Sequence, residues 1–255
     1  MKIIAIANQK GGVGKTTTAM NLAAGLVQKK KKVLCIDFDP QGNLSDYLGY
    51  VPDNQDDICD LMINVAQQKP MRLCTAIRHN TEGIDYIPSS ITLASADMFL
   101  AQIMCRENVL CNVLQAEEFE KYDFVIIDCL PSLGILLTNA LAAANGVIIP
   151  VQAQKFSLDG VDHLLQAIRL VQRNLNPQLI IFGVLLTMTD NTNMCKAVKE
   201  TLIERFGTQV FETTIRRGVE ATESTYAQKS MTSAARSKIG EEYRNVVCEL
   251  LKREG

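Results

Sequence analysis

Short apolar runs alternate with longer segments of helical periodicity along most of the chain. The apolar runs are typical of buried strands and lie at residues 2–7, 33–37, 83–88, 122–128, 146–151 and 179–187. Helical spacing of apolar residues is found at residues 17–29, 58–66, 93–104, 133–144, 157–174, 194–206 and 239–252. Because strands and helices alternate, the pattern predicts an α/β fold: a single doubly wound, mostly parallel sheet with helices on both faces.

The composition fits one globular domain spanning residues 1–255. Hydrophobic residues make up 47% of the chain and charged residues 21%, and no linker, repeat or low-complexity tract divides it. Strand-like sequence starts at residue 2, so we expect neither a signal peptide nor an N-terminal helix-turn-helix extension. The net charge of −2 excludes a bulk positive field, so any DNA binding would depend on a local basic patch.

The eight cysteines indicate a reducing compartment. They include no C-x-x-C pair and no histidine at zinc-ligand spacing, so we expect neither a zinc site nor a disulfide scaffold. No stretch approaches the ~20 apolar residues of a membrane-spanning helix. We therefore expect a cytoplasmic protein that does not act on a membrane.

The stretch with the most chemical information follows the first apolar run. Residues 8–18 read NQKGGVGKTTT, and Gly11, Gly12 and Gly14 allow successive backbone N–H groups to turn toward an anion. The helix that follows adds its positive dipole end, and Lys15 can reach the outer phosphates of a nucleotide. The layout predicts a phosphate-binding loop.

This loop also offers a metal ligand and departs from the usual P-loop at one position. The hydroxyl of Thr16 is placed to ligate Mg²⁺. The usual pattern has glycine five residues before Gly14, where this chain has Gln9. The departure is accompanied by Lys10, a second lysine inside the loop.

Aspartates end two of the predicted strands. Asp37 and Asp39 follow the strand at residues 33–37, at the edge where open parallel sheets bind ligands. A turn and helix cap is the alternative for both residues; beside the loop we favour a functional role for Asp39 and leave Asp37 open. Asp128 follows four apolar residues, a Walker-B pattern whose carboxylate holds the Mg²⁺ shell through water or engages the attacking water.

Two charged segments have alternative interpretations. Residues 29–32 are four lysines, which we interpret as solvated side chains at a helix C-terminus rather than as a nucleic-acid patch. The polar face of the helix at residues 239–252 carries acids as well as Lys and Arg. A membrane-surface helix would be mostly basic there, so we expect this helix to pack on the core.

Taken together, these motifs resemble the ParA/MinD family of deviant-Walker ATPases. Residues 10–17 (KGGVGKTT) resemble its Walker A, residues 37–43 (DFDPQGN) its switch I, and residues 125–132 (VIIDCLPS) its Walker B and switch II. Residues 150–172 and 183–188 resemble later blocks, so the likeness runs from end to end. It is similar to the small, Soj-like branch without an N-terminal helix-turn-helix domain.

The resemblance implies an ATP- and Mg²⁺-dependent homodimer with nucleotide between two subunits. Lys10 would cross to the partner's phosphates, Asp39 would orient or activate the attacking water, and Lys15 would be the third catalytic residue. Thr16 would ligate Mg²⁺ and Asp128 would support it through water. Thr17 would meet the α-phosphate. The nucleotide would contact Lys10, Gly11, Gly12, Val13, Gly14, Lys15, Thr16 and Thr17 in the loop, with Met188 and Ile215 beside the adenine.

The family's dimer also binds DNA without sequence preference through basic residues near its C-terminal region, where this chain departs from the pattern. Arg216 replaces a proline, and Glu220 stands where many members carry a DNA-facing arginine. Arg236 and Lys238 remain, and Arg217 with Arg216 can compensate, so these four are the candidate DNA-binding residues.

The leading hypothesis is a slow ATPase switch for plasmid or chromosome partitioning, stimulated by a ParB-like partner and nucleoid-associated when bound to DNA. A second hypothesis is a positioning or regulatory ATPase that acts on a protein cargo or a membrane-bound partner. A third, a metabolic P-loop enzyme, would need a small-molecule acceptor site that the sequence does not reveal.

Overall fold

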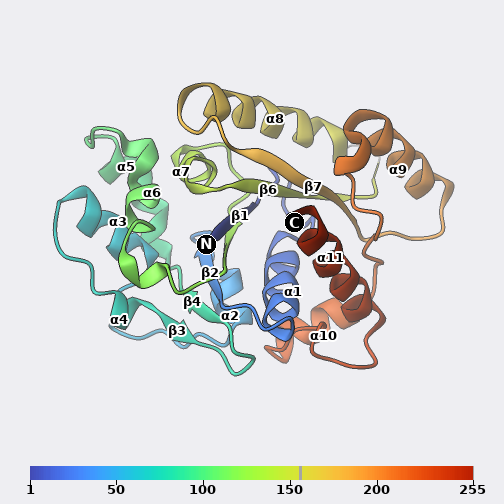
Figure 1. Ribbon diagram of the computed structural model, residues 1–255, viewed down its shortest axis with the longest axis horizontal. Coiled ribbons are helices and arrows are strands. Elements are labelled where there is room, and N and C mark those ends of the chain that lie inside the picture. Colours follow the sequence, from blue (N-terminus) through green and yellow to red (C-terminus); the bar gives the residue numbers. More distant parts are fainter. Residues whose placement is uncertain (155–156, 255) are drawn as a thin grey trace.

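The computed structural model describes residues 1–154 and 157–254, which form a layered α/β fold (Figure 1). Its seven-stranded sheet has the order β3-β4-β2-β5-β1-β6-β7. Neighbouring strands are parallel except for the β3–β4 edge pair. This confirms the expected doubly wound, mostly parallel sheet. The strands are β1 (Lys2–Ile6), β2 (Val33–Phe38), β3 (Arg78–His79), β4 (Asp85–Ile87), β5 (Phe124–Cys129), β6 (Gly146–Gln152) and β7 (Ile180–Thr187).

Helices cover both faces of the sheet. One layer packs in a core with Ile4, Ile6 and Ile126, and the other in a core with Ala5, Val125 and Ile127. The first layer consists of α1 (Lys15–Gln28), α2 (Asn43–Tyr47), α10 (Glu220–Tyr226) and α11 (Lys238–Glu254). The second consists of α3 (Ile58–Ala66), α4 (Leu73–Ala76), α5 (Ala96–Leu100), α6 (Val109–Val113), α7 (Ile135–Ala143), α8 (Ser157–Asn174) and α9 (Asn193–Phe206).

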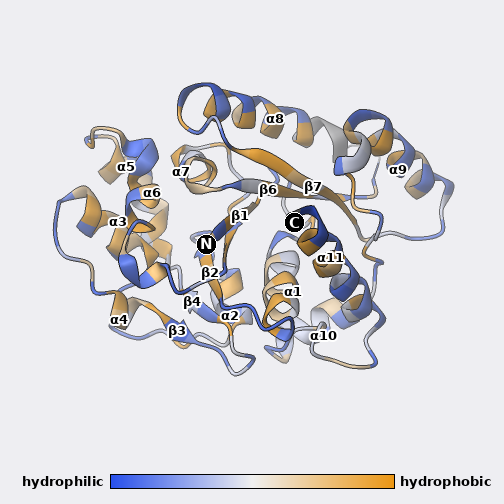
Figure 2. Ribbon diagram, viewed as in Figure 1, coloured by the Kyte–Doolittle hydropathy of each residue, from blue (hydrophilic) through white to orange (hydrophobic). Residues whose placement is uncertain are grey.

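Side chains alternate between the two cores along each central strand, because successive strand residues point to opposite faces. Figure 2 shows the result: the central strands are mainly hydrophobic, and the outer helices carry hydrophilic residues on their outward sides. Within the part of the chain that the structure describes, no helix is both long and apolar enough to cross a membrane.

Sheet register brings the predicted motifs to one edge. Asp37 of β2 lies opposite Asp128 of β5, and Ile6 of β1 lies opposite Asp128 from the other side. The glycine-rich loop follows β1 directly, so the loop and both aspartates meet at the carboxyl ends of the central strands. That edge is where ligands bind in open α/β sheets.

The segment at residues 93–104 is not the single helix that its periodicity predicted. It is divided into a 3₁₀ turn, η1 (Ile91–Ser95), the short helix α5 and an irregular stretch that ends at Cys105, whose φ is 53°. The hydroxyl of Ser95 donates to the carbonyl of Thr92 at 2.7 Å, a local bond that competes with helical pairing. Three further 3₁₀ turns are η2 (Arg106–Asn108), η3 (Glu117–Phe119) and η4 (Gly207–Gln209).

Candidate functional site

The glycine-rich loop has a conformation that only small residues adopt without strain. Gly12 and Gly14 have φ values of 72° and 87°, in the left-handed region that glycine tolerates best. Helix α1 begins immediately afterwards at Lys15, with no acidic side chain in its first turn. The loop therefore presents the free N–H groups and positive dipole end of a long helix to the cavity above it.

Lys15 is held inside the loop. It is buried, and its Nζ donates to the backbone carbonyl of Lys10 at 3.3 Å. Burial lowers the pKa of this ammonium, while the nearby carboxylate of Asp128 acts in the opposite direction. The side chain is thus fixed where it can place a positive charge against a bound anion.

Thr16 and Asp128 form the metal-binding candidate. The Thr16 hydroxyl donates to Oδ2 of Asp128 at 2.6 Å. Oδ1 of Asp128 is buried and has no hydrogen-bond partner within the described residues. Burial, followed by the neighbouring Asp37, raises the pKa of Asp128 to about 8.

These two oxygen donors fit Mg²⁺. A buried carboxylate oxygen without a hydrogen-bond partner would be stabilised by a cation. Mg²⁺ is commonly bound through one or two protein oxygens together with phosphates and waters. No group of three or more His, Cys, Asp or Glu side chains in the described residues could hold a metal without such help.

Asp37, whose role the sequence left open, is an anchor rather than a cavity residue. Its Oδ2 accepts bonds from the backbone N–H and the hydroxyl of Ser45, both at 2.7 Å, and its Oδ1 accepts from the backbone N–H of Asp39 at 3.2 Å. Burial raises the pKa of Asp37 to about 6. The carboxyl of Asp37 therefore fixes the turn that carries Asp39.

Asp39 itself faces the phosphate-side cavity. This cavity, of about 490 Å³, is lined by Asp39 and Gln41 and, from the loop, by Gly11, Gly12, Gly14, Lys15, Thr16 and Thr17. The Asp39 carboxylate accepts the backbone N–H of Gln41 at 2.9 Å, which orients it at the start of the turn. The structure thus brings Lys15, Thr16 and Asp39 around one cavity.

A smaller cavity of about 210 Å³ continues from the first. The two share Gly14, Thr17 and Met188, and the smaller one is also lined by Ile215 and Tyr243. Its wall is mainly apolar, which suits a planar base. Met188 and Ile215, the two residues expected beside the adenine, both line this cavity.

Lys10 and Val13 lie apart from the cavity lining. The Lys10 ammonium donates to Oε1 of Gln154 at 3.1 Å and does not line the phosphate-side cavity of its own chain. Val13 is buried, and its carbonyl accepts from the Thr187 hydroxyl at 2.9 Å. Val13 thus shapes the loop through its backbone, while Lys10 leaves the loop in another direction.

The sequence analysis did not identify three further residues that line the phosphate-side cavity. Asn43, Tyr47 and Thr225 line it, and the Tyr47 hydroxyl lies 2.5 Å from the hydroxyl of Ser224 in α10. Asn43 belongs to the quoted switch I motif and was available as a candidate. Thr225 follows it by more than 180 positions, so no local pattern connects the two.

The four candidate DNA-binding residues are not equivalent. Arg216 is neutralised by Glu242, whose Oε1 lies 2.5 Å from the guanidinium Nε. Arg216 and Arg217 both line the smaller cavity, and all four residues are exposed. The unfavourable Glu220 accepts a hydrogen bond from the Ser237 hydroxyl. Among the described residues, Arg216 is thus the one of the four whose charge is offset by an ion pair.

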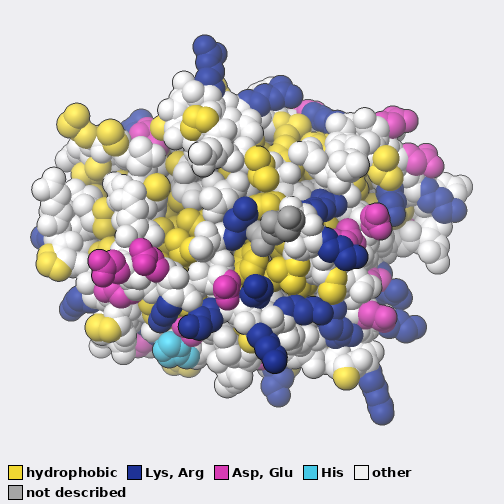
Figure 3. Space-filling view, in the orientation of Figure 1, with side chains coloured by type: hydrophobic (Ala, Val, Ile, Leu, Met, Phe, Trp, Pro, Cys, Tyr) yellow, Lys and Arg dark blue, Asp and Glu magenta, His cyan; other side chains and the backbone are white. Residues whose placement is uncertain are grey.

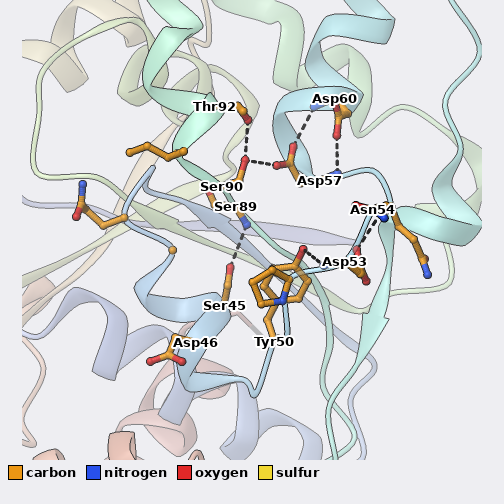
Figure 4. Close-up of a pocket in the computed structure, with 15 residues that line it drawn as sticks. Ser45, Asp46, Tyr50, Asp53, Asn54, Asp57, Asp60, Ser89, Ser90 and Thr92 are labelled. Atoms are coloured by element: carbon orange, nitrogen blue, oxygen red, sulfur yellow. Dashed lines mark hydrogen bonds between the residues drawn. The ribbon is translucent and has the colours of Figure 1, made fainter.

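A third cavity of about 650 Å³ lies beyond Gln41 and Asp46, which also line the phosphate-side cavity. Figure 4 shows its lining: Asp57 and Asp60 at the start of α3 lie close to Ser90, and Asp53 lies near Tyr50. Asp57 accepts from the Ser90 hydroxyl and forms a reciprocal cap with Asp60. The polar lining of this cavity is dominated by carboxylates and hydroxyls.

Comparisons with known proteins identify the family of this chain. A family described as an AAA domain matches residues 1–181. The sporulation initiation inhibitor protein Soj of Bacillus subtilis is 44% identical over 88% of this chain and 87% of its own length. The chromosome-partitioning ATPase Soj of Treponema pallidum is 43% identical over 88% and 86%, respectively. The chain belongs to the ParA/MinD family. The resemblance inferred from the motifs is thereby confirmed.

A solved structure shares the fold of this chain. A cobyrinic acid a,c-diamide synthase from Mycobacterium smegmatis, with a bound ATP analogue and magnesium, superposes with a TM-score of 0.85. It is 33% identical and covers 100% of this chain and 96% of its own. The fold of this chain is therefore of the type that its motifs predicted.

Proposed function

We propose that this protein is an ATP- and Mg²⁺-dependent ATPase switch for partitioning plasmid or chromosomal DNA. The observation that carries the proposal is the pair of joined cavities, one lined by the phosphate-binding loop and the other mainly apolar. Together they match the two ends of a nucleotide. The ATP analogue and magnesium in the M. smegmatis structure support the same ligands here.

In this proposal the loop binds the phosphates. The N–H groups from Gly11 to Thr17 and the ammonium of Lys15 hold the β- and γ-phosphates, and Thr17 meets the α-phosphate. Met188 and Ile215 enclose the adenine. Thr16 and Asp128 would hold Mg²⁺, directly and through water, and the metal would neutralise the charge that develops on the phosphates.

Asp39 orients or activates the attacking water. Its carboxylate lines the same cavity as Lys15 and Thr16, and Asp37 fixes the turn that carries it. The described lining of the phosphate-side cavity contains no arginine and no histidine. A subunit that lacks an arginine finger and a strong base hydrolyses ATP slowly, so turnover would depend on a partner.

Dimerisation completes the site. Lys10 does not line the cavity of its own chain and lies at the surface beside Gln154. A lysine in this position would add positive charge to the γ-phosphate bound by a second copy of the chain. The proposal is therefore an ATP-bound homodimer in which each Lys10 serves the other subunit.

The names of the relatives support partitioning as the process. The T. pallidum relative is a chromosome-partitioning ATPase, and by analogy the dimer would bind double-stranded DNA without sequence preference and respond to a ParB-like protein. Arg217, Arg236 and Lys238 would contribute DNA contacts, and Arg216 only after release from Glu242. That ion pair weakens one of the four expected DNA contacts, and the second hypothesis, a switch acting on a protein cargo, needs none of them.

A metabolic role is less well supported. The cavity next to the nucleotide site is the place for an acceptor, but Asp46, Asp53, Asp57 and Asp60 line it. These carboxylates would repel an acidic acceptor molecule. The acid-rich cavity therefore does not favour a cobyrinic-acid-like substrate.

The deciding experiment measures binding to a nonspecific DNA duplex with ATP, with ADP and without nucleotide. The proposal predicts binding that requires ATP and weakens with added salt, because phosphate contacts release counterions. Dimerisation with ATP but without DNA binding at low salt would contradict DNA partitioning and favour the cargo switch. Light scattering of the same samples reports the dimer independently.

A further inference from the structure

The four lysines at residues 29–32 end helix α1 in an unusual conformation. Lys30 has a φ of 61°, and its N–H and that of Lys31 bond back to the carbonyls of Val27 and Leu26 at 2.8 and 3.1 Å. This is the Schellman ending of a helix, at whose left-handed position glycine is the least strained residue. The chain places a lysine there instead, so a positive charge is kept at a conformational cost.

The lysine side chains point to solvent without neutralising partners. Lys29, Lys30 and Lys32 are exposed and Lys31 is half-buried. Within residues 1–154 and 157–254, none of the four forms an ion pair. The nearby Asp123 carboxylate accepts the backbone N–H of Lys32 at 2.8 Å. Surface lysines that lack partners keep their full charge for an external anion.

Helix α11 brings a fifth cation to this place. Arg244 donates to the carbonyl of Thr232 at 2.7 Å, and Gln28, the residue before the lysine run, donates to the same carbonyl at 3.1 Å. Arg244 is also without an ion pair within the described part of the chain. We call Lys29, Lys30, Lys31, Lys32 and Arg244 the lysine-rich surface.

This surface lies at the opposite edge of the sheet from the nucleotide site. Helix α1 starts at the phosphate-binding loop, and its 14 residues place its far end about 20 Å away. The contacts of Thr18 with Tyr243 and of Gly25 with Val247 show that α11 runs alongside in the same sense. In Figure 3, Lys and Arg side chains gather over the ends of these two helices.

We infer that the lysine-rich surface is a contact site for the phosphate backbone of double-stranded DNA. This inference rests on the proposed function. It replaces the interpretation of residues 29–32 as solvated side chains only, and it moves the main contact away from Arg216 and its neighbours. Four consecutive lysines offer point charges without a shape that reads bases, which suits binding without sequence preference. An anionic lipid surface is a poorer match, because the apolar residues Val246, Val247 and Leu250 of α11 are buried in the core and cannot insert.

The test replaces the charges and leaves the fold in place. In the quadruple variant, Lys29, Lys31 and Lys32 become Gln and Lys30 becomes Gly, which suits the left-handed backbone. A second variant carries only Lys29→Gln and Lys32→Gln, in case the first does not fold. The matched control removes four cations elsewhere on the surface: Lys69→Gln, Arg173→Gln, Lys196→Gln and Lys199→Gln.

Binding of the full-length chain to a nonspecific duplex is measured with ATP over a range of salt concentrations. The quadruple variant is expected to bind at least about tenfold more weakly and to lose about two or more units of the slope of log K against log salt. The double variant should lie between it and wild type, and the control should resemble wild type. ATP binding and dimerisation should remain unchanged in all three.

Three results would overturn the inference in distinguishable ways. If wild type binds DNA and the quadruple variant binds equally well, the surface is wrong and the proposed function stands. If the control loses as much affinity as the quadruple variant, only bulk charge matters. If wild type does not bind DNA in any nucleotide state, the inference and DNA partitioning both fail, and lysine-dependent binding to phosphatidylglycerol vesicles would then identify a lipid surface.

Discussion

Lys10 and Lys15 lie five positions apart in one loop, yet their side chains leave it in different directions. Lys15 is buried against the carbonyl of Lys10, whereas Lys10 extends to Gln154 at the surface. The charge of Lys15 is therefore held inside the subunit, whereas the charge of Lys10 is available to a second copy of the chain. Single substitutions separate the two roles.

Lys10→Ala should leave ATP binding to the monomer nearly intact, because its side chain does not line the cavity. ATP-induced dimerisation should be lost, and turnover should fall on the order of 100-fold through loss of charge at the γ-phosphate. Binding of a fluorescent ATP analogue, light scattering and phosphate release measure these effects. Lys15→Ala is the control that abolishes nucleotide binding. A Lys10→Ala protein that dimerises and turns over like wild type would show that Lys10 was misassigned.

Asp39→Ala should bind ATP and dimerise but hydrolyse on the order of 100-fold more slowly, because the attacking water loses its orienting carboxylate. The neighbouring Asp37→Ala is the contrast. It leaves the two Ser45 donors without their acceptor and should lower the free energy of unfolding by about 1–3 kcal/mol. Phosphate release and urea unfolding distinguish the two. Normal hydrolysis by Asp39→Ala would remove it from the mechanism.

The sequence predicted which residues meet at the site, but not the different roles of residues that are close together in the chain, such as Asp37 and Asp39. Gly12, Lys15, Thr16 and Asp128 were all identified from spacing, since a phosphate loop and a strand-end aspartate are local patterns. Asp37 stayed ambiguous because its role depends on Ser45 in α2 and on burial. Those are tertiary facts that a strand-and-turn pattern does not contain.

At the scale of elements, the start of α11 leaves no space for a side chain at Gly240. A Cβ there would lie 2.0 Å from the backbone carbonyl oxygen of Met231. The same region lines the smaller cavity through Met231 and Ile239. The packing of this helix against the preceding loop therefore supports the adenine side of the site.

Gly240→Ala should destabilise the protein by about 1–3 kcal/mol, because backbone must move to relieve the overlap. ATP affinity should fall as well, since the cavity wall moves with it. Thermal unfolding and nucleotide titration measure the two effects. Gly160→Ala in α8 is the matched control: its Cβ would meet Asn8 Oδ1 at an ordinary 3.6 Å, so stability should be unchanged or slightly higher. Equal stability of both variants would contradict the packing argument.

Long periodic elements were predictable and short ones were not. The helices α1, α3, α8, α9 and α11 follow hydrophobic periodicity, and α7 and the buried strands are apolar runs, both of which local sequence records. Helices α2, α4, α6 and α10 span four to seven residues, too few for a period to show. The division of residues 93–104 depends on hydroxyl bonds and a turn at Cys105 that apolar spacing does not reveal.

At the scale of the whole molecule, two buried carboxyls make stability depend on pH. Burial raises the pKa of Asp37 to about 6 and that of Asp128 to about 8, whereas unfolded carboxyls titrate at about 4. The folded state thus binds protons more tightly than the unfolded state. The contribution to stability is fully present below about pH 4 and is lost as the pH rises through about 6 and about 8.

Without nucleotide and Mg²⁺, the free energy of unfolding should therefore decrease between about pH 4 and about pH 8. Urea titrations at a series of pH values measure the decrease. Asp128→Asn removes the acid with the higher pKa and its repulsion of Asp37, so the variant should gain stability relative to wild type as the pH rises. Parallel curves for the two proteins would show that these carboxyls do not cause the dependence.

Helix α1 connects the phosphate-binding loop with the lysine-rich surface. Its first residue belongs to the phosphate-binding loop, and the residues after its last turn form the lysine-rich surface. Two subunits that meet at their nucleotide cavities would turn these surfaces outward, about 40 Å or more apart. Each dimer would then hold two separate duplex segments, and the avidity of two contacts would make tight binding depend on ATP, which forms the dimer. Such a dimer would cross-link DNA. Adding ATP should therefore compact a single long DNA molecule and raise the viscosity of a solution that contains many DNA molecules.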